Sequence, residues 1–145
     1  MANSRQIAGM RGVYMVAAEL SRLGFVVSPT SRSALGADLL VTDQLCRRTF
    51  SVQVKTNAKT FNFWLLNKKA KELISPSHIY ILVNIRKEGE IIEYFIVPSE
   101  VISKKMVTEK RKTSIWYSIS YDDVKSFLKT GKSSIIPNDL HTCLR

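Results

Sequence analysis

Hydrophobic and polar positions alternate in two short runs near the middle of the chain, within residues 36–56. The first run reads Gly-Ala-Asp-Leu-Leu-Val and the second reads Thr-Phe-Ser-Val-Gln-Val-Lys-Thr, with a polar turn between them. In the second run the apolar side chains share one face of a strand and the polar ones share the other, because side chains of a strand alternate. The polar set is Ser51, Gln53 and Lys55. The pattern predicts an antiparallel hairpin with one polar face.

Apolar residues recur every three or four positions from about Ser4 to Leu23, which is typical of an amphipathic helix. Gly24 is a natural end for this helix. A short strand at 25–27 follows, and Pro29 keeps the next polar segment out of helix. Residues 61–65 also alternate, and we expect them to add a third strand to the sheet of the hairpin.

The second half of the chain contains the longest apolar run. Residues 78–85 are almost continuously apolar, which predicts a strand buried on both faces. A turn at 87–90 leads into a partner strand at 91–97, and a late strand is expected at 116–119. Three helices are also predicted: 68–74 capped by Asn67, 99–106 started by Pro98 or Ser99, and 121–131 closed by Gly131. This order predicts an α/β domain, a mixed sheet with helices on both faces.

Length and composition favour a single soluble domain over residues 1–145. Apolar residues make up 45% of the 145, enough for a sizeable core. No apolar run approaches the ~20 residues needed to span a bilayer, and the first residues lack a signal-peptide layout, so we expect a cytoplasmic protein. Cys46 and Cys143 fit neither a disulfide framework nor a zinc spacing.

The charge is the informative part of the composition. The chain has 22 Lys and Arg against 12 Asp and Glu, a formal net charge of +10. An excess of this size on a small domain favours a polyanionic partner, most often nucleic acid.

Candidate chemistry lies on the hairpin. Asp38 offers a carboxylate, Gln53 an amide oxygen and Lys55 a cation, a set that suits a hard divalent ion beside an anion. Taken singly, Asp38 also suits a turn cap at a strand end, and Lys55 a solvated strand position.

The order of these motifs resembles the PD-(D/E)XK nuclease superfamily. The resemblance rests on Gly-Ala-Asp-Leu-Leu followed by Gln-Val-Lys, and on the segments 12–25 and 64–70 that flank them. It covers about residues 5–100, with 101–145 as a C-terminal extension, and it implies a restriction-endonuclease-like core. Most members carry Asp or Glu where Gln53 stands, whereas Mrr-like members carry Gln.

The resemblance implies a metal-dependent DNA endonuclease that hydrolyses phosphodiester bonds. Asp38, Gln53 and the Val54 carbonyl would bind Mg²⁺ or Mn²⁺, and Lys55 would orient water and stabilise the transition state. Many such nucleases pair to reach both strands, so a homodimer is a further expectation.

The first helix departs from the superfamily pattern. Many members carry a metal-binding glutamate near the positions of Val13 and Tyr14, but the acidic residue here is Glu19. At ~100° per residue, Glu19 falls on a different helix face. Either the helix is aimed differently and Glu19 is the fourth catalytic residue, or the third acidic ligand is missing.

Several basic and polar residues are candidates for phosphate contact. They are Arg32, Ser33, Lys59, Lys68, Lys69 and Lys71. The basic run 104–112 is either a further backbone contact or a solvated face. Trp64 and Trp116 offer rings for base stacking, although a tryptophan in an alternating strand is usually part of the core.

Two alternatives to an active nuclease stay open. One is a degenerate nuclease fold that binds nucleic acid or a protein without cleavage, favoured by the neutral Gln53 and the absent helix glutamate. The other is an immunity-type interaction protein whose basic surface meets an acidic partner.

Overall fold

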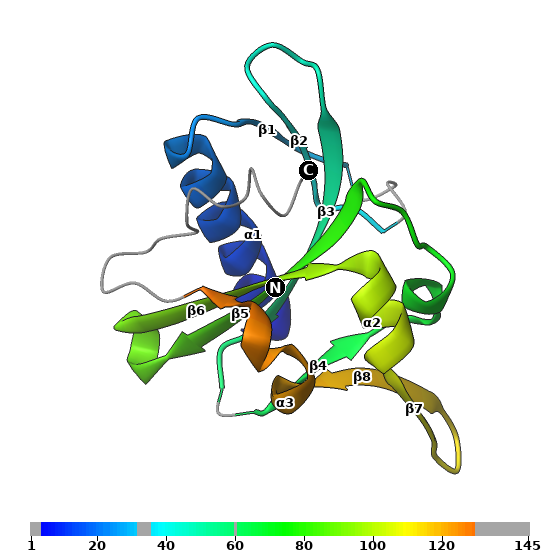
Figure 1. Ribbon diagram of the computed structural model, residues 1–145. Helices are drawn as coiled ribbons and strands as arrows, with labels where there is room; N and C mark the ends of the chain where they lie inside the picture. Colours follow the sequence, from blue (N-terminus) through cyan, green and yellow to red (C-terminus); the bar gives the residue numbers. More distant parts are fainter. Residues whose placement is uncertain (1–3, 32–35, 60, 130–145) are drawn as a thin grey trace.

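A six-stranded mixed sheet occupies the centre of the protein (Figure 1), in the strand order β1-β2-β3-β5-β6-β9. The computed structural model describes residues 4–31, 36–59 and 61–129. Strands β3 and β5 run parallel, and the other neighbours are antiparallel. The bounds are β1 Val26–Pro29, β2 Leu39–Thr42, β3 Thr49–Asn57, β5 His78–Arg86, β6 Ile91–Pro98 and β9 Leu128–Lys129.

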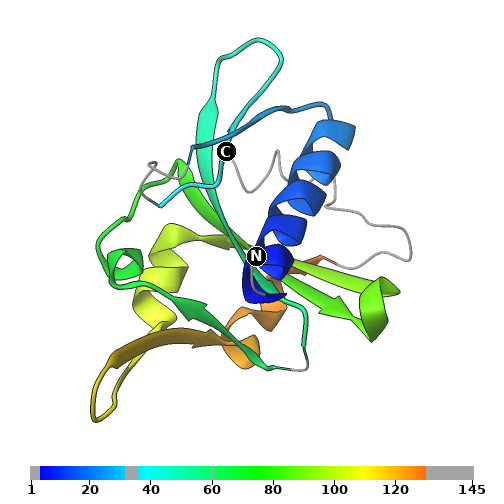
Figure 2. The same cartoon turned by 180° about the vertical axis from the view of Figure 1, so that it is seen from behind.

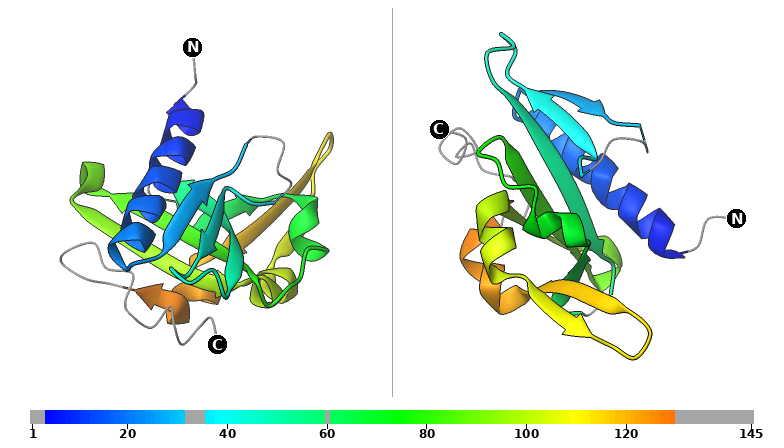
Figure 3. Two further views of the ribbon diagram at one scale, coloured as in Figure 1. Left: turned by 90° about the horizontal axis from the view of Figure 1, so that it is seen from above. Right: turned by 90° about the vertical axis from the view of Figure 1, so that its right-hand side faces the viewer.

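The two faces of this sheet are covered differently. Helix α1 crosses one face (Figure 2), whereas α2 and a second, three-stranded sheet lie on the other side (Figure 3, right). The second sheet is antiparallel, in the order β4-β8-β7. The bounds are α1 Ser4–Arg22, α2 Ser99–Lys105, α3 Tyr121–Val124, β4 Phe63–Leu66, β7 Val107–Lys110 and β8 Ile115–Ser120, with short 3-10 turns at Lys68–Lys71, Lys87–Gly89 and Lys125–Phe127.

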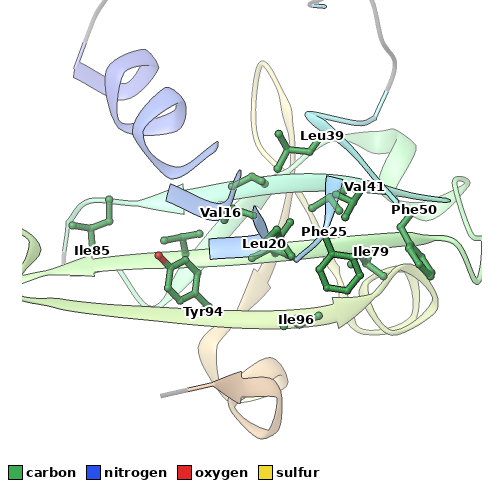
Figure 4. Close-up of a cluster of buried hydrophobic side chains, with 14 residues drawn as sticks. Val16, Leu20, Phe25, Leu39, Val41, Phe50, Ile79, Ile85, Tyr94 and Ile96 are labelled. Carbon is green, nitrogen blue, oxygen red and sulfur yellow. The ribbon is translucent and has the colours of Figure 1, made fainter. Parts of the chain in front are cut away.

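Strand β5 separates two hydrophobic cores. Its residues are buried on both faces until Arg86, as the continuous apolar run predicts. Between α1 and the sheet lies one cluster, in which Val16 and Leu20 meet Val41, Ile79 and Tyr94 (Figure 4). The second cluster fills the space toward α2 and the second sheet and consists of Trp64, Ala70, Tyr80, Leu82, Phe95, Val97, Ile102, Met106, Ile119 and Val124.

The predicted α/β class, the first helix, the central hairpin and the β5–β6 pair are confirmed. The strand predicted near 61–65 exists, but its assignment to the hairpin's sheet is wrong. Strand β4 pairs with β8 of the second sheet, because Trp64 and Ile119 face the second core together. Among the described residues no helix is long and apolar enough to cross a membrane.

Two predicted helices are shorter than expected. The segment after Asn67 is one 3-10 turn, Lys68–Lys71, and the Asn67 side chain does not cap it. The helix predicted to reach Gly131 stops early. Ser120 does cap α3, but the chain leaves the helix at Leu128, which pairs with Phe95 and packs on the second core. The basic run 104–112 holds the end of α2 and strand β7.

Helix α1 approaches β3 closely at Gly12. A Cβ atom on Gly12 would overlap the Thr56 hydroxyl, whereas a Cβ on Gly9 would meet nothing within 4 Å. Gly12 is buried, in the same stripe as Val16 and Leu20. A glycine at this position therefore sets the distance between helix and sheet, and with it the space beside the C-terminal end of β3.

We expect Gly12→Ala to lower the free energy of unfolding by about 1–3 kcal/mol, the usual cost of overpacking. Gly9→Ala is the matched control on the same helix, and it should be neutral or stabilising by up to about 1 kcal/mol from helix propensity. Urea denaturation measures both. Equal stability of the two variants would show that the helix moves freely away from Thr56.

Candidate active site at the fork between two strands

The central sheet splits where β2 leaves β3. Their pairing ends at Leu39↔Val52, whereas β3 continues to Asn57 beside β5. The edge of β3 is therefore open from Val54 onward. Asp38 lies at this fork, and its N–H donates to the Val52 carbonyl over 2.8 Å.

Beyond the end of β2, the Asp38 side chain replaces the β2 backbone as the hydrogen-bond partner of β3. Its Oδ2 accepts a hydrogen bond from the Val54 N–H at 2.8 Å and a second from Gln53 Nε2. Because the N–H and C=O of one strand residue point to the same side, the Val54 carbonyl also lies on the open edge. Asp38, Gln53 and Val54 thus gather three polar groups at one point.

Lys55 belongs to the same polar face. Alternation along β3 buries Phe50, Val52 and Val54 and leaves Gln53 and Lys55 half-buried on the other side. Burial lowers the pKa of Lys55, and attraction by the Asp38 carboxylate partly offsets this by raising it. The structure therefore brings Asp38, Gln53 and Lys55 together on one face, as the alternation predicts.

A cleft extends from Asp38 to the N-terminal half of α1. Thr30 supports its other wall: its hydroxyl donates to the Ala37 carbonyl at 2.6 Å and its N–H to the Asp38 carbonyl at 2.9 Å. The lining residues are Gln6, Gly9, Met10, Val13, Tyr14, Pro29, Thr30, Ser31, Ala37 and Asp38. None of the α1 residues in this lining is acidic. The sequence could have indicated Gln6 and Met10, which share a helix face with Val13.

The structure does not bring Glu19 to this cleft. Glu19 is buried, and its carboxylate accepts from Arg22 Nε at 3.0 Å. Its charge, together with burial as the larger cause, raises the pKa of Tyr94 to about 12. Glu19 belongs to the buried residues of α1, with Val16 and Leu20, and not to the residues that line the cleft.

A second polar pair continues the same face of β3. Ser51 Oγ and His78 Nδ1 are 2.7 Å apart, and the two residues are register partners on β3 and β5. Burial lowers the pKa of His78, and hydrogen bonding with the Ser51 backbone partly offsets this by raising it. His78 thus holds Ser51, two positions before Gln53, and acts as a structural support of the site.

The candidate phosphate contacts are distributed over several segments. Arg32 and Ser33 lie outside the described residues. Lys59 follows β3, and Lys68, Lys69 and Lys71 lie on the 3-10 turn after β4; all four are exposed. The Lys71 ammonium lies 6.0 Å from the centre of the Tyr117 ring, toward the second sheet.

This architecture is the restriction-endonuclease-like fold. It is shared with Hjc, a Holliday junction resolvase from Archaeoglobus fulgidus, at a TM-score of 0.54 and 14% identity, over 87% of this chain and 94% of that one. The bacterial homing endonuclease I-Ssp6803I matches at a TM-score of 0.51 and 16% identity, over 99% of this chain and 93% of that one. No protein-family model and no curated protein matches the sequence.

We expect the pKa of Lys55 to fall further in Asp38→Asn than in the native protein. The amide still accepts hydrogen bonds from Val54 and Gln53, but the carboxylate that raises the pKa is lost while burial stays. An NMR titration of the lysine Cε and Nζ shifts measures the change. An unchanged or higher value would mean that Asp38 and Lys55 are not electrostatically coupled.

Proposed function

We propose that this protein is a metal-dependent nuclease that hydrolyses phosphodiester bonds in DNA. The observation that carries the proposal is the meeting of Asp38, Gln53 and Val54 at the strand fork, beside Lys55. The fold neighbours named for junction resolution and homing endonuclease activity support the same reading, as does the net charge of +10.

The donor set at the fork fits Mg²⁺ or Mn²⁺. Both hydrogen bonds to Asp38 fall on Oδ2, and Gln53 uses its Nε2, so Asp38 Oδ1, Gln53 Oε1 and the Val54 carbonyl remain as oxygen ligands. In the described part of the chain, no three His, Cys, Asp or Glu side chains form a metal-binding group. One carboxylate with an amide and a carbonyl oxygen is a set that Mg²⁺ can use, because it commonly takes one or two carboxylates and keeps several waters. When bound, the ion would act as a Lewis acid toward the phosphate.

The residues of the chain supply binding and electrostatic stabilisation. Lys55 is a partly desolvated cation, so its attraction for phosphate oxygens is stronger than that of an exposed lysine. It is placed to stabilise the additional negative charge of the transition state. Gln53 and the Val54 N–H hold the Asp38 carboxylate in one orientation, which keeps its other oxygen directed at the reacting group.

The second candidate is a nuclease fold that binds DNA without cleaving it. Two observations favour it: Gln53 contributes no negative charge, and the α1 residues lining the cleft include no carboxylate. Both candidates predict salt-sensitive DNA binding. Only the nuclease predicts turnover that depends on Mg²⁺ and on Asp38.

We expect Mg²⁺-dependent cleavage of duplex or branched DNA by the native protein. Asp38→Asn and Lys55→Met should each reduce the rate at least about 100-fold, because each removes a charge used in the transition state. Lys125→Met removes an exposed lysine paired with Asp122 and should retain the native rate. If the native protein binds these DNAs but never cuts them, the binding candidate replaces the nuclease.

We further expect Gln53→Glu to bind Mg²⁺ about 10-fold more tightly, because an added carboxylate raises the ligand charge. Without metal this variant loses the hydrogen bond to Asp38 and places two carboxylates together, so its Tm should fall. The rise in Tm on adding Mg²⁺ should therefore exceed that of the native protein, a readout that needs no cleavage. An equal rise in both proteins would argue against Gln53 as a metal ligand.

A further inference from the structure

The second sheet has one face in the core and one face in solvent. Trp64, Leu66, Tyr117 and Ile119 point inward, as the pairing of β4 with β8 requires. The opposite side chains of the sheet, with Phe61 just before β4, form what we call the outer aromatic face. Its large residues are 37–57% exposed and are Phe61, Phe63, Leu65, Val107 and Trp116.

This composition is unusual for the solvent side of an antiparallel sheet, where polar residues are the norm. The same face also carries Ser118, Ser120 and Glu109, and the exposed apolar residues among them offer an interaction surface. The Phe61 and Phe63 rings lie 5.6 Å apart. The Trp116 indole is held in place, since its Nε1 donates to Ser114 Oγ at 2.9 Å and the Arg111 guanidinium lies 4.1 Å from its ring centre. The rings are thus partly fixed before any partner binds.

Exposed basic residues surround the outer aromatic face. Arg111 and Lys112 lie at the β7–β8 hairpin and Lys59 lies two positions before Phe61, whereas Lys110 pairs with Ile115 on the opposite face of the sheet. Glu109 is on this face and is ion-paired with Arg111 at 3.2 Å, so this pair contributes no net charge, and Lys59 and Lys112 supply the positive charge. Aromatic rings edged by cations match the chemistry of single-stranded nucleic acid, whose bases stack while its phosphates need positive charge. A neutral apolar partner would not account for the basic residues at the edge of this face.

The outer aromatic face is tied to the strand that carries Lys55. Asn57, the last residue of β3, donates from Nδ2 to the Phe63 carbonyl at 2.6 Å. We propose that this face binds unpaired bases of a nucleic acid strand, so that the protein takes a substrate with a single-stranded segment next to the strand fork. The link to the fork rests on the proposed function, whereas the base-binding site stands on the second sheet alone.

The test is fluorescence-anisotropy binding of an oligothymidylate of about 12 nucleotides, within the site sizes of such proteins, in EDTA so that no cleavage occurs. Phe63→Leu and Trp116→Leu keep apolar side chains but remove a ring, and each should weaken binding roughly 5- to 100-fold, the range of one lost stacking contact. Leu45→Ala removes a more exposed apolar side chain, 69% accessible, from the β2–β3 turn and should leave affinity unchanged.

An abasic oligonucleotide of the same length separates stacking from charge. The native protein should bind it more weakly than Trp116→Leu binds the intact strand, because no stacking contact is left, and the ring variants should bind it like the native protein. Circular dichroism confirms that each variant is folded. Ring variants that bind the intact strand like the native protein overturn the proposal. It is also overturned if the variants differ from the native protein only in their self-association, measured by sedimentation.

The two proposals fail separately. Asp38→Asn tests the nuclease alone, since Asp38 is not on the outer aromatic face. A protein that binds unpaired bases but cleaves no DNA would overturn the nuclease and leave this site standing. If Phe63→Leu and Trp116→Leu cleave DNA and bind the oligothymidylate like the native protein, the base-binding site is overturned and the nuclease is left standing.

Discussion

The site depends on one hydrogen bond in the central sheet, in which the Asp38 carboxylate replaces a backbone carbonyl as the acceptor for β3. Val54 would lose its strand neighbour where β2 departs, and an unpaired, partly buried N–H is costly. The Asp38 Oδ2 atom fills that position. Because the same oxygen also holds Gln53, the end of β2, the open edge of β3 and the polar face of β3 are fixed relative to one another. The geometry of the site therefore follows from satisfying the backbone hydrogen-bonding groups at the edge of β3.

The surrounding packing keeps that fork open instead of filling it. Gly12 lets α1 lie close against Thr56, so the helix braces β3 just past the point where β2 leaves. Its N-terminal half then forms one wall of the cleft, opposite Thr30 and Asp38. On the other side of the sheet, Lys55 lies at the margin of the second core, which is what desolvates it. Two separate cores thus support two sides of one site.

Local patterns predicted the parts of the fold that depend on local sequence. The alternation at 50–55 gave the face of Gln53 and Lys55, and the apolar run at 78–85 gave a strand buried on both sides. The second sheet was missed because β4 pairs with β8, more than fifty residues later, and no local pattern encodes such a partner. The sequence separated Glu19 from the face of Val13 and Tyr14 but left open which face meets the fork; in the structure Val13 and Tyr14 line the cleft and Glu19 does not. From the sequence alone, an alternating apolar stripe such as Phe61, Phe63 and Leu65 is interpreted as buried, because periodicity does not show which face of a strand meets solvent.

The charge of the fork affects how strongly the binding of a metal ion and the binding of nucleic acid are coupled. With Asp38 as the carboxylate and Gln53 neutral, the fork offers a divalent cation less negative charge than a pair of acids would, and Lys55 opposes a cation directly. A phosphate group changes that balance, because its negative charge attracts both the cation and Lys55. Under the proposed function, nucleic acid and metal should therefore bind with positive coupling, each raising the affinity for the other by the same factor. If the proposed function holds, a basic surface that attracts nucleic acid would also favour metal binding at the fork.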